Sequence, residues 1–199
     1  MGTISAEMVK QLRGKTGAGI MNCKEALTEC NGDINTAVDF LRKKGMATAE
    51  KRVGRAMTEG IIESYIHMGG KLGVLVEVNC ETDFVAKNDD FKKFARNLAM
   101  HIAATNPVGI SQEDVSEDVI NKEKEIYRAQ ALEMGKPENI VDKIAEGKLS
   151  KYFKDNCLLS QDYVRDTNIT IADLLNELIV KIGENISIKR FVRFQTGES

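Results

Sequence analysis

Apolar side chains recur every three to four positions in three short runs within the first 45 residues. The first run follows Ser5, a residue type that caps helix N-termini, and stops at a glycine-containing turn. The second run stops at Asn31-Gly32. The third follows Asp33, another capping residue, and reaches Gly45, a residue type that often ends helices. We therefore predict a three-helix module over residues 1–45.

The pattern changes after this module. Residues 46–59 combine basic and small side chains with little apolar order, which predicts an exposed connecting segment. Residues 61–67 and 72–78 are β-type runs separated by Met68-Gly69-Gly70-Lys71, which predicts a β-hairpin.

Helical periodicity returns beyond the hairpin. The apolar face of residues 91–102 predicts a helix that ends before Asn106-Pro107 and covers the sheet. Further helices are predicted over residues 113–134, from the Gly135-Lys136-Pro137 break to about residue 155, and over residues 171–182, with an irregular segment before the last.

The last apolar pattern has a period of two residues, as in a strand. Ile186, Ile188, Val192 and Phe194 would share one face of that strand, which we expect to join the hairpin. The predicted fold class is α+β: the N-terminal three-helix module is followed by a core, residues 60–199, in which helices pack on a three-stranded antiparallel sheet.

Composition narrows the function classes. The chain has 199 residues and a formal net charge of -2, so no overall field favours nucleic acid or an anionic membrane. No segment approaches the roughly 20 apolar residues of a membrane span, and the start lacks the pattern of a secretion signal or transit peptide. Four irregularly spaced cysteines and two histidines suggest no zinc site. We expect a reduced, cytoplasmic protein without a cofactor or metal.

The motifs that resemble catalytic or nucleotide-binding sites fail on spacing. Gly14-Lys15-Thr16 lacks the first glycine of a phosphate-binding loop, and Gly17-x-Gly19 lacks the third glycine of a dinucleotide fingerprint. His101 falls on the predicted helix 91–102, where a packed, hydrogen-bonded histidine is the simpler interpretation. No catalytic set emerges, and we predict that the protein is not an enzyme.

One stretch rich in basic residues leaves an alternative function open. The stretch 42–55 could neutralise phosphates, so a nucleic-acid-binding adaptor is the competing hypothesis. It lacks interleaved aromatic residues and any groove-reading motif, which favours a solvated face. Its basic residues are Arg42, Lys43, Lys44, Lys51, Arg52 and Arg55.

Three ordered motifs carry a resemblance to a known family. The run Thr82-Asp83-Phe84-Val85-Ala86-Lys87-Asn88-Asp89-Asp90-Phe91 follows the second hairpin strand. The N-terminal run Leu12-Arg13-x-x-Thr16-Gly17-Ala18-Gly19-Ile20-Met21-Asn22-Cys23-Lys24 and the later Lys181-Ile182-Gly183-Glu184-Asn185-Ile186 agree with it, as does the closing Arg193-Phe194. Together they resemble the elongation factor Ts family over almost the whole chain.

The resemblance implies a guanine-nucleotide exchange factor with the GTPase elongation factor Tu as its partner. In that family, the Thr-Asp-Phe-Val element disturbs the site of the magnesium ion on the GTPase, and GDP is released so that GTP can bind. Carried over, these residues are Thr82, Asp83, Phe84 and Val85. Spacing alone favours a different interpretation, a strand-to-helix corner that Asp83 caps while Phe84 joins the core.

The resemblance also implies further contacts with the partner. Lys10, Arg13, Ile20 and Met21 match the surface of the family's N-terminal module, while His67 and Ile182 match positions near the Thr-Asp-Phe-Val element. Each also has a plain structural interpretation: Met21 and Ile182 as core, and His67 as a polar residue at a strand end.

Length separates this chain from the longer family members, which resemble two copies of the hairpin-plus-helix core and carry a coiled-coil insertion. This chain has one core and no apparent room for the insertion. We therefore expect a homodimer, paired through the sheet or its helices, that forms a 2:2 complex with elongation factor Tu. We expect no membrane or direct nucleic-acid partner.

Overall fold

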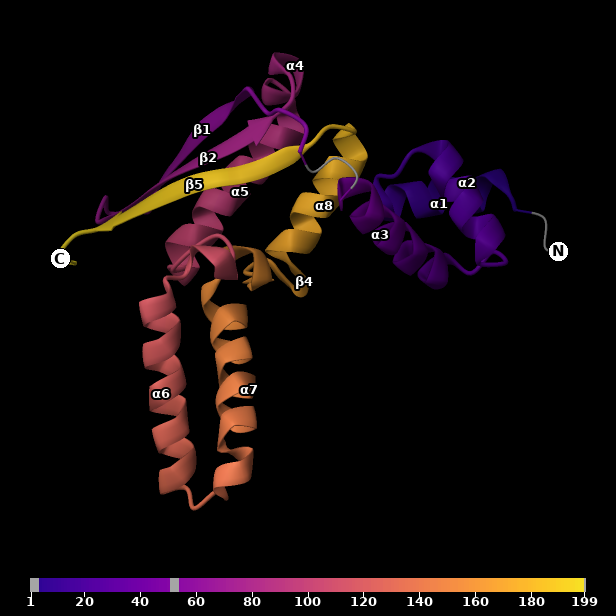
Figure 1. The fold of residues 1–199 in the computed structure, drawn as a ribbon. Helices are drawn as coiled ribbons and strands as arrows, with labels where there is room; N and C mark the ends of the chain where they lie inside the picture. The colour runs from indigo at the N-terminus through magenta and orange to yellow at the C-terminus, as the bar shows by residue number, and fades with distance from the viewer. Residues whose placement is uncertain (1–3, 51–53, 199) are drawn as a thin grey trace. The chain divides into compact units, whose positions relative to one another are not determined.

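The computed structural model describes residues 4–50 and 54–198 (Figure 1). The chain forms two compact units that do not follow its linear order. One comprises Met1–Glu63, Val76–Arg96 and Asp173–Lys189, and the other comprises Ser64–Leu75, Asn97–Ala172 and Arg190–Ser199. The α+β class is confirmed, with N-terminal helices followed by a three-stranded antiparallel sheet packed with helices.

The first unit begins with the three predicted helices, α1 (Ala6–Thr16), α2 (Ile20–Glu29) and α3 (Ile34–Glu50). The predicted caps are confirmed: Ser5 Oγ accepts from the Met8 amide at 3.2 Å, and Asp33 Oδ1 accepts from the Thr36 amide at 2.6 Å. The three helices enclose a small apolar core of their own. Its buried members are Leu12, Ala18, Cys23, Ala26, Leu27, Ala37 and Leu41.

The predicted end of the third helix at Gly45 is wrong, because α3 continues to Glu50. Gly45 is buried, and a Cβ atom built on it would lie 2.8 Å from Val180 of α8 (Ile171–Ile182). The glycine therefore permits close approach of another helix and does not serve as a cap. The proposed division into residues 1–45, 46–59 and 60–199 stays a prediction.

The sheet has the strand order β1 (Glu59–Ile66), β2 (Leu72–Cys80), β5 (Ile186–Gln195), so the hairpin and the last strand join as predicted. At the hairpin turn, the His67 amide donates to the Leu72 carbonyl at 2.9 Å, and Gly69 and Gly70 adopt positive φ angles. These angles suit a tight turn between antiparallel strands.

One face of β2 is buried, and so is one face of helix α5 (Asp89–Thr105). Figure 1 shows α5 running along the sheet. The predicted apolar face of this helix is confirmed, and the helix ends directly before Asn106-Pro107. The buried residues are Val74, Val76, Val78 and Cys80 of β2 with Phe91, Phe94, Ala95, Leu98, Ala99 and Ile102 of α5.

The predicted single apolar face of the last strand is wrong. Ile186 and Ile188 are buried, but Val192 and Phe194 are exposed. Two successive exposed residues, Lys189 and Arg190, interrupt the alternation, so the second half of β5 has the opposite phase from the first.

The second unit contains a pair of long helices, α6 (Glu117–Glu133) and α7 (Glu138–Asn156), which contact one another along their length (Figure 1). The turn at Met134–Pro137 joins them, as the sequence predicted. The two helices predicted on either side of the Gly135-Lys136-Pro137 break therefore exist and form a helical hairpin. The predicted start at residue 113 is also wrong, because a separate 3-10 turn covers Gln112–Asp114.

The segment expected to be irregular contains regular structure. A 3-10 turn, η2 (Leu158–Ser160), is followed by β3 (Asp162–Tyr163) and β4 (Asp166–Thr170), which pair antiparallel. His101 of α5 lies fully buried in this unit, and its Nε2 is 2.9 Å from Gln161 Oε1. The expectation of a packed, hydrogen-bonded histidine is confirmed.

Candidate functional site

The Thr-Asp-Phe-Val run forms the short helix α4 (Asp83–Ala86) at the corner between β2 and α5. Thr82 is its N-cap, and its Oγ1 accepts from the Val85 amide at 3.4 Å. Val85 and Ala86 are buried and attach the helix to the core. Immediately afterwards, Asn88 Oδ1 accepts from the Asp90 amide at 2.8 Å and so caps α5.

Phe84 is 78% exposed, whereas Phe91 seven positions later is fully buried. The interpretation in which Phe84 joins the core is therefore wrong, and so is the assignment of Asp83 as the cap. Since α4 turns Val85 and Ala86 inward, its other side must face solvent, and Asp83 and Phe84 occupy that side. The corner presents an aromatic ring next to a carboxylate.

Asp83 is already engaged in the free protein. The ammonium group of Lys87 lies 2.7 Å from Asp83 Oδ2. The hydrogen bond from Lys87 and its positive charge hold the pKa of the Asp83 carboxyl below its usual value. Asp83 is therefore a carboxylate at neutral pH and can accept hydrogen bonds.

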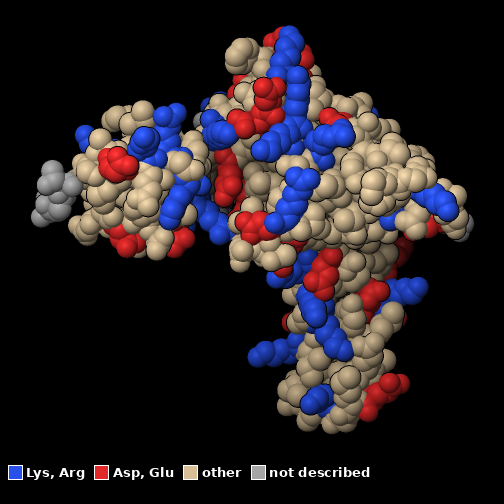
Figure 2. Space-filling view, turned by 180° about the vertical axis from the view of Figure 1, so that it is seen from behind, with Lys and Arg blue, Asp and Glu red and all other residues tan. Residues whose placement is uncertain are grey.

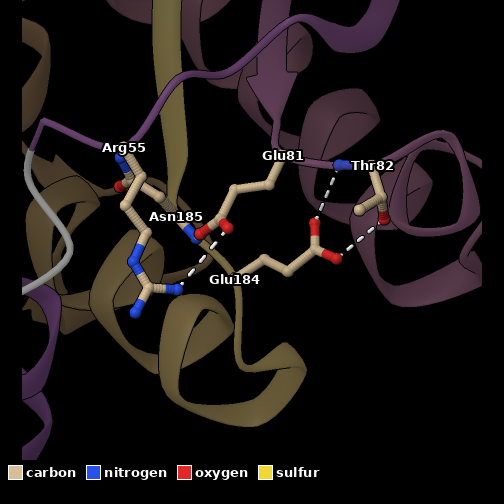
Figure 3. Close-up of polar contacts among 5 residues, drawn as sticks. All are labelled: Arg55, Glu81, Thr82, Glu184 and Asn185. Carbon is tan, nitrogen blue, oxygen red and sulfur yellow. Dashed lines mark hydrogen bonds and ion pairs between the residues drawn. The ribbon is translucent and has the colours of Figure 1, made fainter.

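Polar contacts fix the base of this corner (Figure 3). Glu184 accepts from the backbone amide of Thr82 at 3.1 Å and from its hydroxyl at 2.7 Å. Glu81 accepts from the Asn185 amide at 2.6 Å and pairs with Arg55 at 3.5 Å. Glu184 and Glu81 were not predicted as functional residues, although Glu184 lies within the Lys-Ile-Gly-Glu-Asn-Ile motif.

The thiol of Cys80 completes the corner from inside. It is buried and donates to the Thr82 carbonyl at 3.2 Å. Burial raises the pKa of Cys80 to about 11, and the negative charge of Glu184 acts in the same direction. The thiol is therefore protonated and serves as a structural donor.

Three of the four candidate residues on the N-terminal module line one groove. Lys10, Arg13 and Ile20 line a hollow of about 590 Å³, which falls within the usual size range of binding pockets. Its floor and rim also include Ile4, Ala6, Val9 and Lys24. Met21 adjoins this surface in sequence and is 75% exposed, which excludes the interpretation of Met21 as core.

The remaining candidates lie elsewhere. His67 is exposed at the hairpin turn, where its Nδ1 is 2.9 Å from the Tyr65 hydroxyl oxygen. It belongs to the other unit from the α4 corner. Ile182 ends α8 and is half-buried.

The basic stretch 42–55 is largely neutralised where the structure describes it. Arg42 pairs with Asp173, Lys44 with Glu25 at 2.6 Å, and Arg55 with Glu81. Lys51 and Arg52 lie outside the described residues. Figure 2 shows acidic side chains interspersed with basic ones over the molecular face that it presents. These pairings weigh against a phosphate-binding surface.

Within residues 4–50 and 54–198, no group of three histidine, cysteine or acidic side chains is placed to hold a metal ion. In the same part of the chain, no helix is both long enough and apolar enough to cross a bilayer.

Comparisons with known proteins agree with the motifs. The model of the family described as "Elongation factor TS" matches residues 21–198. The chain is 68% identical to the Elongation factor Ts of Desulfosudis oleivorans over 198 residues, which cover 100% of both chains. It is 60% identical to that of Caldanaerobacter subterraneus subsp. tengcongensis over 195 residues, which cover 98% of each chain. The chain belongs to the elongation factor Ts family.

Proposed function

We propose that the α4 corner is the element through which this chain promotes release of GDP from elongation factor Tu. Elongation factor Ts is a non-catalytic nucleotide exchange factor for that GTPase. The observation that carries the assignment is the exposure of Phe84 on a helix whose opposite side is buried. An exposed aromatic ring on a fixed base is the kind of side chain that dominates binding energy in protein interfaces.

The mechanism requires displacement, not bond chemistry. Phe84 enters an apolar pocket of the GTPase while the Asp83 carboxylate accepts a hydrogen bond beside it. The partner's groups that hold Mg²⁺ and phosphate shift in response. Thr82 and Val85 hold α4 in place, because Thr82 caps the helix and Val85 attaches it to the core.

Linkage sets the size of the effect. If the factor weakens GDP binding about a thousandfold, GDP must weaken binding of the factor by the same ratio, a coupling of about 4 kcal/mol. GDP and the factor therefore compete through a transient ternary complex. The factor leaves when GTP binds, since the coupling acts in both directions.

The groove on the N-terminal module supplies a second contact. Ile20 and Met21 offer exposed apolar surface, and Lys10 and Arg13 offer cations beside it. An acidic, apolar surface of the GTPase would complement this groove. His67 and Ile182 are assigned as further contacts, which rest on the family motifs alone.

We also propose that two copies of the chain pair through the outer face of the sheet and bind two GTPase molecules. Ile66, Leu75, Val192 and Phe194 are exposed and belong to one unit. Ile66, Leu75 and Phe194 line a common hollow of about 450 Å³. A sheet face this apolar is normally covered, and a second copy covers it symmetrically.

The assignment is tested by displacement of fluorescent GDP from elongation factor Tu. Phe84→Ala is expected to slow the release at saturating factor by at least about tenfold, the loss typical of an interface anchor. Met134→Ala, at another exposed apolar residue, is the matched control. Equal release rates for Phe84→Ala and the unmodified protein would refute the role of the corner.

A further inference from the structure

The carboxylate of Glu184 binds one residue with both of its oxygens. Oε2 lies 3.1 Å from the Thr82 backbone nitrogen, and Oε1 lies 2.7 Å from Thr82 Oγ1 (Figure 3). Both contacts run from a donor on Thr82 to an ionised acceptor, so both are charge-assisted hydrogen bonds. They join positions 102 residues apart in the chain.

The second contact determines how the Thr82 hydroxyl can act. A hydroxyl has one proton and two lone pairs. When its proton is donated to Glu184, only lone pairs remain for other partners. These lone pairs accept from the Val85 amide, which is the bond that caps α4. Glu184 therefore orients the hydroxyl for its capping role.

Every polar group of Thr82 is engaged. Its amide and hydroxyl donate to Glu184, while its carbonyl accepts from the Cys80 thiol at 3.2 Å and from the Ala86 amide at 3.2 Å. This saturation matters because α4 spans only four residues, too few for a helix to be stable by itself. Its geometry must come from the residues that bind its ends.

A second carboxylate contact joins the same two segments, but here the carboxylate belongs to the end of β2 and the donor to the α8–β5 connection. Glu81 is adjacent to Thr82 and accepts from the amide of Asn185, which is adjacent to Glu184. Asn185 is buried, and Arg55 pairs with Glu81. The end of β2 and the α8–β5 connection therefore bind one another through two crossed carboxylates (Figure 3).

Phe84 has no comparable support of its own. It is exposed, so its position follows that of the α4 backbone. We propose that Glu184 is a positioning residue for nucleotide exchange: through the Thr82 hydroxyl and amide it holds α4 in the geometry that presents Phe84 and Asp83 to the GTPase. This inference rests on the proposed function of the α4 corner.

The test uses Glu184→Gln in the full chain. An amide has the size of a carboxylate but replaces one acceptor oxygen with a donor NH₂, so it cannot accept from both Thr82 groups. The maximal rate of fluorescent GDP release from elongation factor Tu is expected to fall about fivefold. Loss of a helix cap would reduce the ratio of ordered to disordered α4 by about this factor. The thermal unfolding midpoint should change little, because Thr82 is exposed and Glu184 is only half-buried.

Asp90→Asn is the matched control. Asp90 pairs with Lys181 at the end of α8 at 2.8 Å, three positions before Glu184, so this variant weakens a neighbouring polar contact without touching Thr82. It should leave the release rate unchanged. If Asp90→Asn slows release as much as Glu184→Gln, general loosening of the end of α8 and the α8–β5 connection explains the effect, and the inference is refuted.

A double-mutant cycle with Thr82→Val separates positioning from direct contact. If Glu184 acts through Thr82, then Glu184→Gln has no further effect once Thr82→Val is present. Multiplicative losses would instead show that Glu184 contacts the partner itself, and would overturn the inference. Should Glu184→Gln reduce the folded fraction, Glu184→Asp replaces it in the cycle, since it keeps the charge but withdraws the oxygens from Thr82.

Phe84→Ala, measured in parallel, shows whether the positioning role of Glu184 or the proposed function of the α4 corner fails. If Phe84→Ala slows release and Glu184→Gln does not, only the positioning role is refuted. If neither variant slows release, the assignment of the α4 corner is itself refuted.

Discussion

The Lys87 ammonium group lies 2.7 Å from the carboxylate of Asp83, one helical turn away at the start of α4. The pair occupies the exposed side of the corner, next to Phe84. Any partner group that bonds to Asp83 must therefore share the carboxylate with Lys87 or replace it.

Removal of Lys87 should change the titration of Asp83. In Lys87→Met the carboxyl loses its hydrogen bond and the neighbouring positive charge, so its pKa should rise toward the ordinary value. The carboxyl ¹³C shift of Asp83, followed by NMR between pH 2 and 6, measures this change, a range that brackets an aspartate titration at about 4. Lys92→Met, at an exposed lysine of α5, is the control. An unaltered Asp83 titration in Lys87→Met would show that the pair does not persist in solution.

Truncation of the two phenylalanines at the corner should change the stability of the protein by very different amounts. Phe91→Ala removes a fully buried ring and should lower the free energy of unfolding by about 3–5 kcal/mol. Phe84→Ala removes an exposed ring and should change it by less than about 0.5 kcal/mol. Urea unfolding followed by circular dichroism measures both. A large loss of stability in Phe84→Ala would mean that the ring is packed within the protein, and the proposed role of Phe84 as an interface anchor would be refuted.

His101 should make the fold sensitive to acid. Its Nε2 is 2.9 Å from Gln161 Oε1, and its Nδ1 accepts from the Val164 amide at 3.4 Å. Burial lowers the pKa of His101 below its ordinary value, although the Gln161 bond opposes the shift. The unfolded chain therefore takes up the proton first as the pH falls below about 6.5, and stability that is complete above this pH declines with further acidification.

Urea midpoints at pH 7.5 and 5.5 test this sensitivity. His101→Gln removes the titrating group, so its midpoint should drop less between the two pH values than that of the unmodified protein. The only other histidine of the sequence, His67, is exposed, and His67→Gln should keep the full pH dependence. Identical pH dependence in all three proteins would exclude His101 as its source.

Pairing through the sheet should depend on Phe194. Phe194→Asp places a charge on the apolar outer face, where the ring is 65% exposed in the single chain. The sedimentation coefficient at micromolar concentration should fall from that of a dimer to that of a monomer, because an unpaired charge in an interface is costly. Met134→Asp introduces the same charge at another exposed apolar site and should leave the dimer intact. A dimer that survives Phe194→Asp would place the contact elsewhere.

Local chemistry was enough to predict much of this fold. The caps at Ser5 and Asp33 and the glycine turn of the hairpin depend on neighbouring residues, and all were predicted correctly. The errors concern tertiary packing. Gly45 resembles a helix end, but the proximity of Val180 explains it. The short strands β3 and β4 have polar compositions that no periodicity reveals.

In the candidate site, too, local sequence patterns did not predict the features that depend on tertiary packing. The exposure of Phe84 could not be derived from spacing, which favours the core, and only the family motif indicated an outward ring. The groove lined by Lys10, Arg13 and Ile20 brings together residues that the family resemblance had grouped. The contact of Glu184 with Thr82 spans 102 positions, so no local pattern could predict it.

Strand β5 contains one residue more than regular alternation needs, because Lys189 and Arg190 both face solvent. Deletion of either one would leave Ile188 inward and Phe194 outward, with both surfaces of the sheet preserved. Deletion of Val192 would instead exchange Arg193 and Phe194 between the two sides. Single-residue deletions in this strand should therefore be tolerated at the Lys189-Arg190 pair but not at Val192.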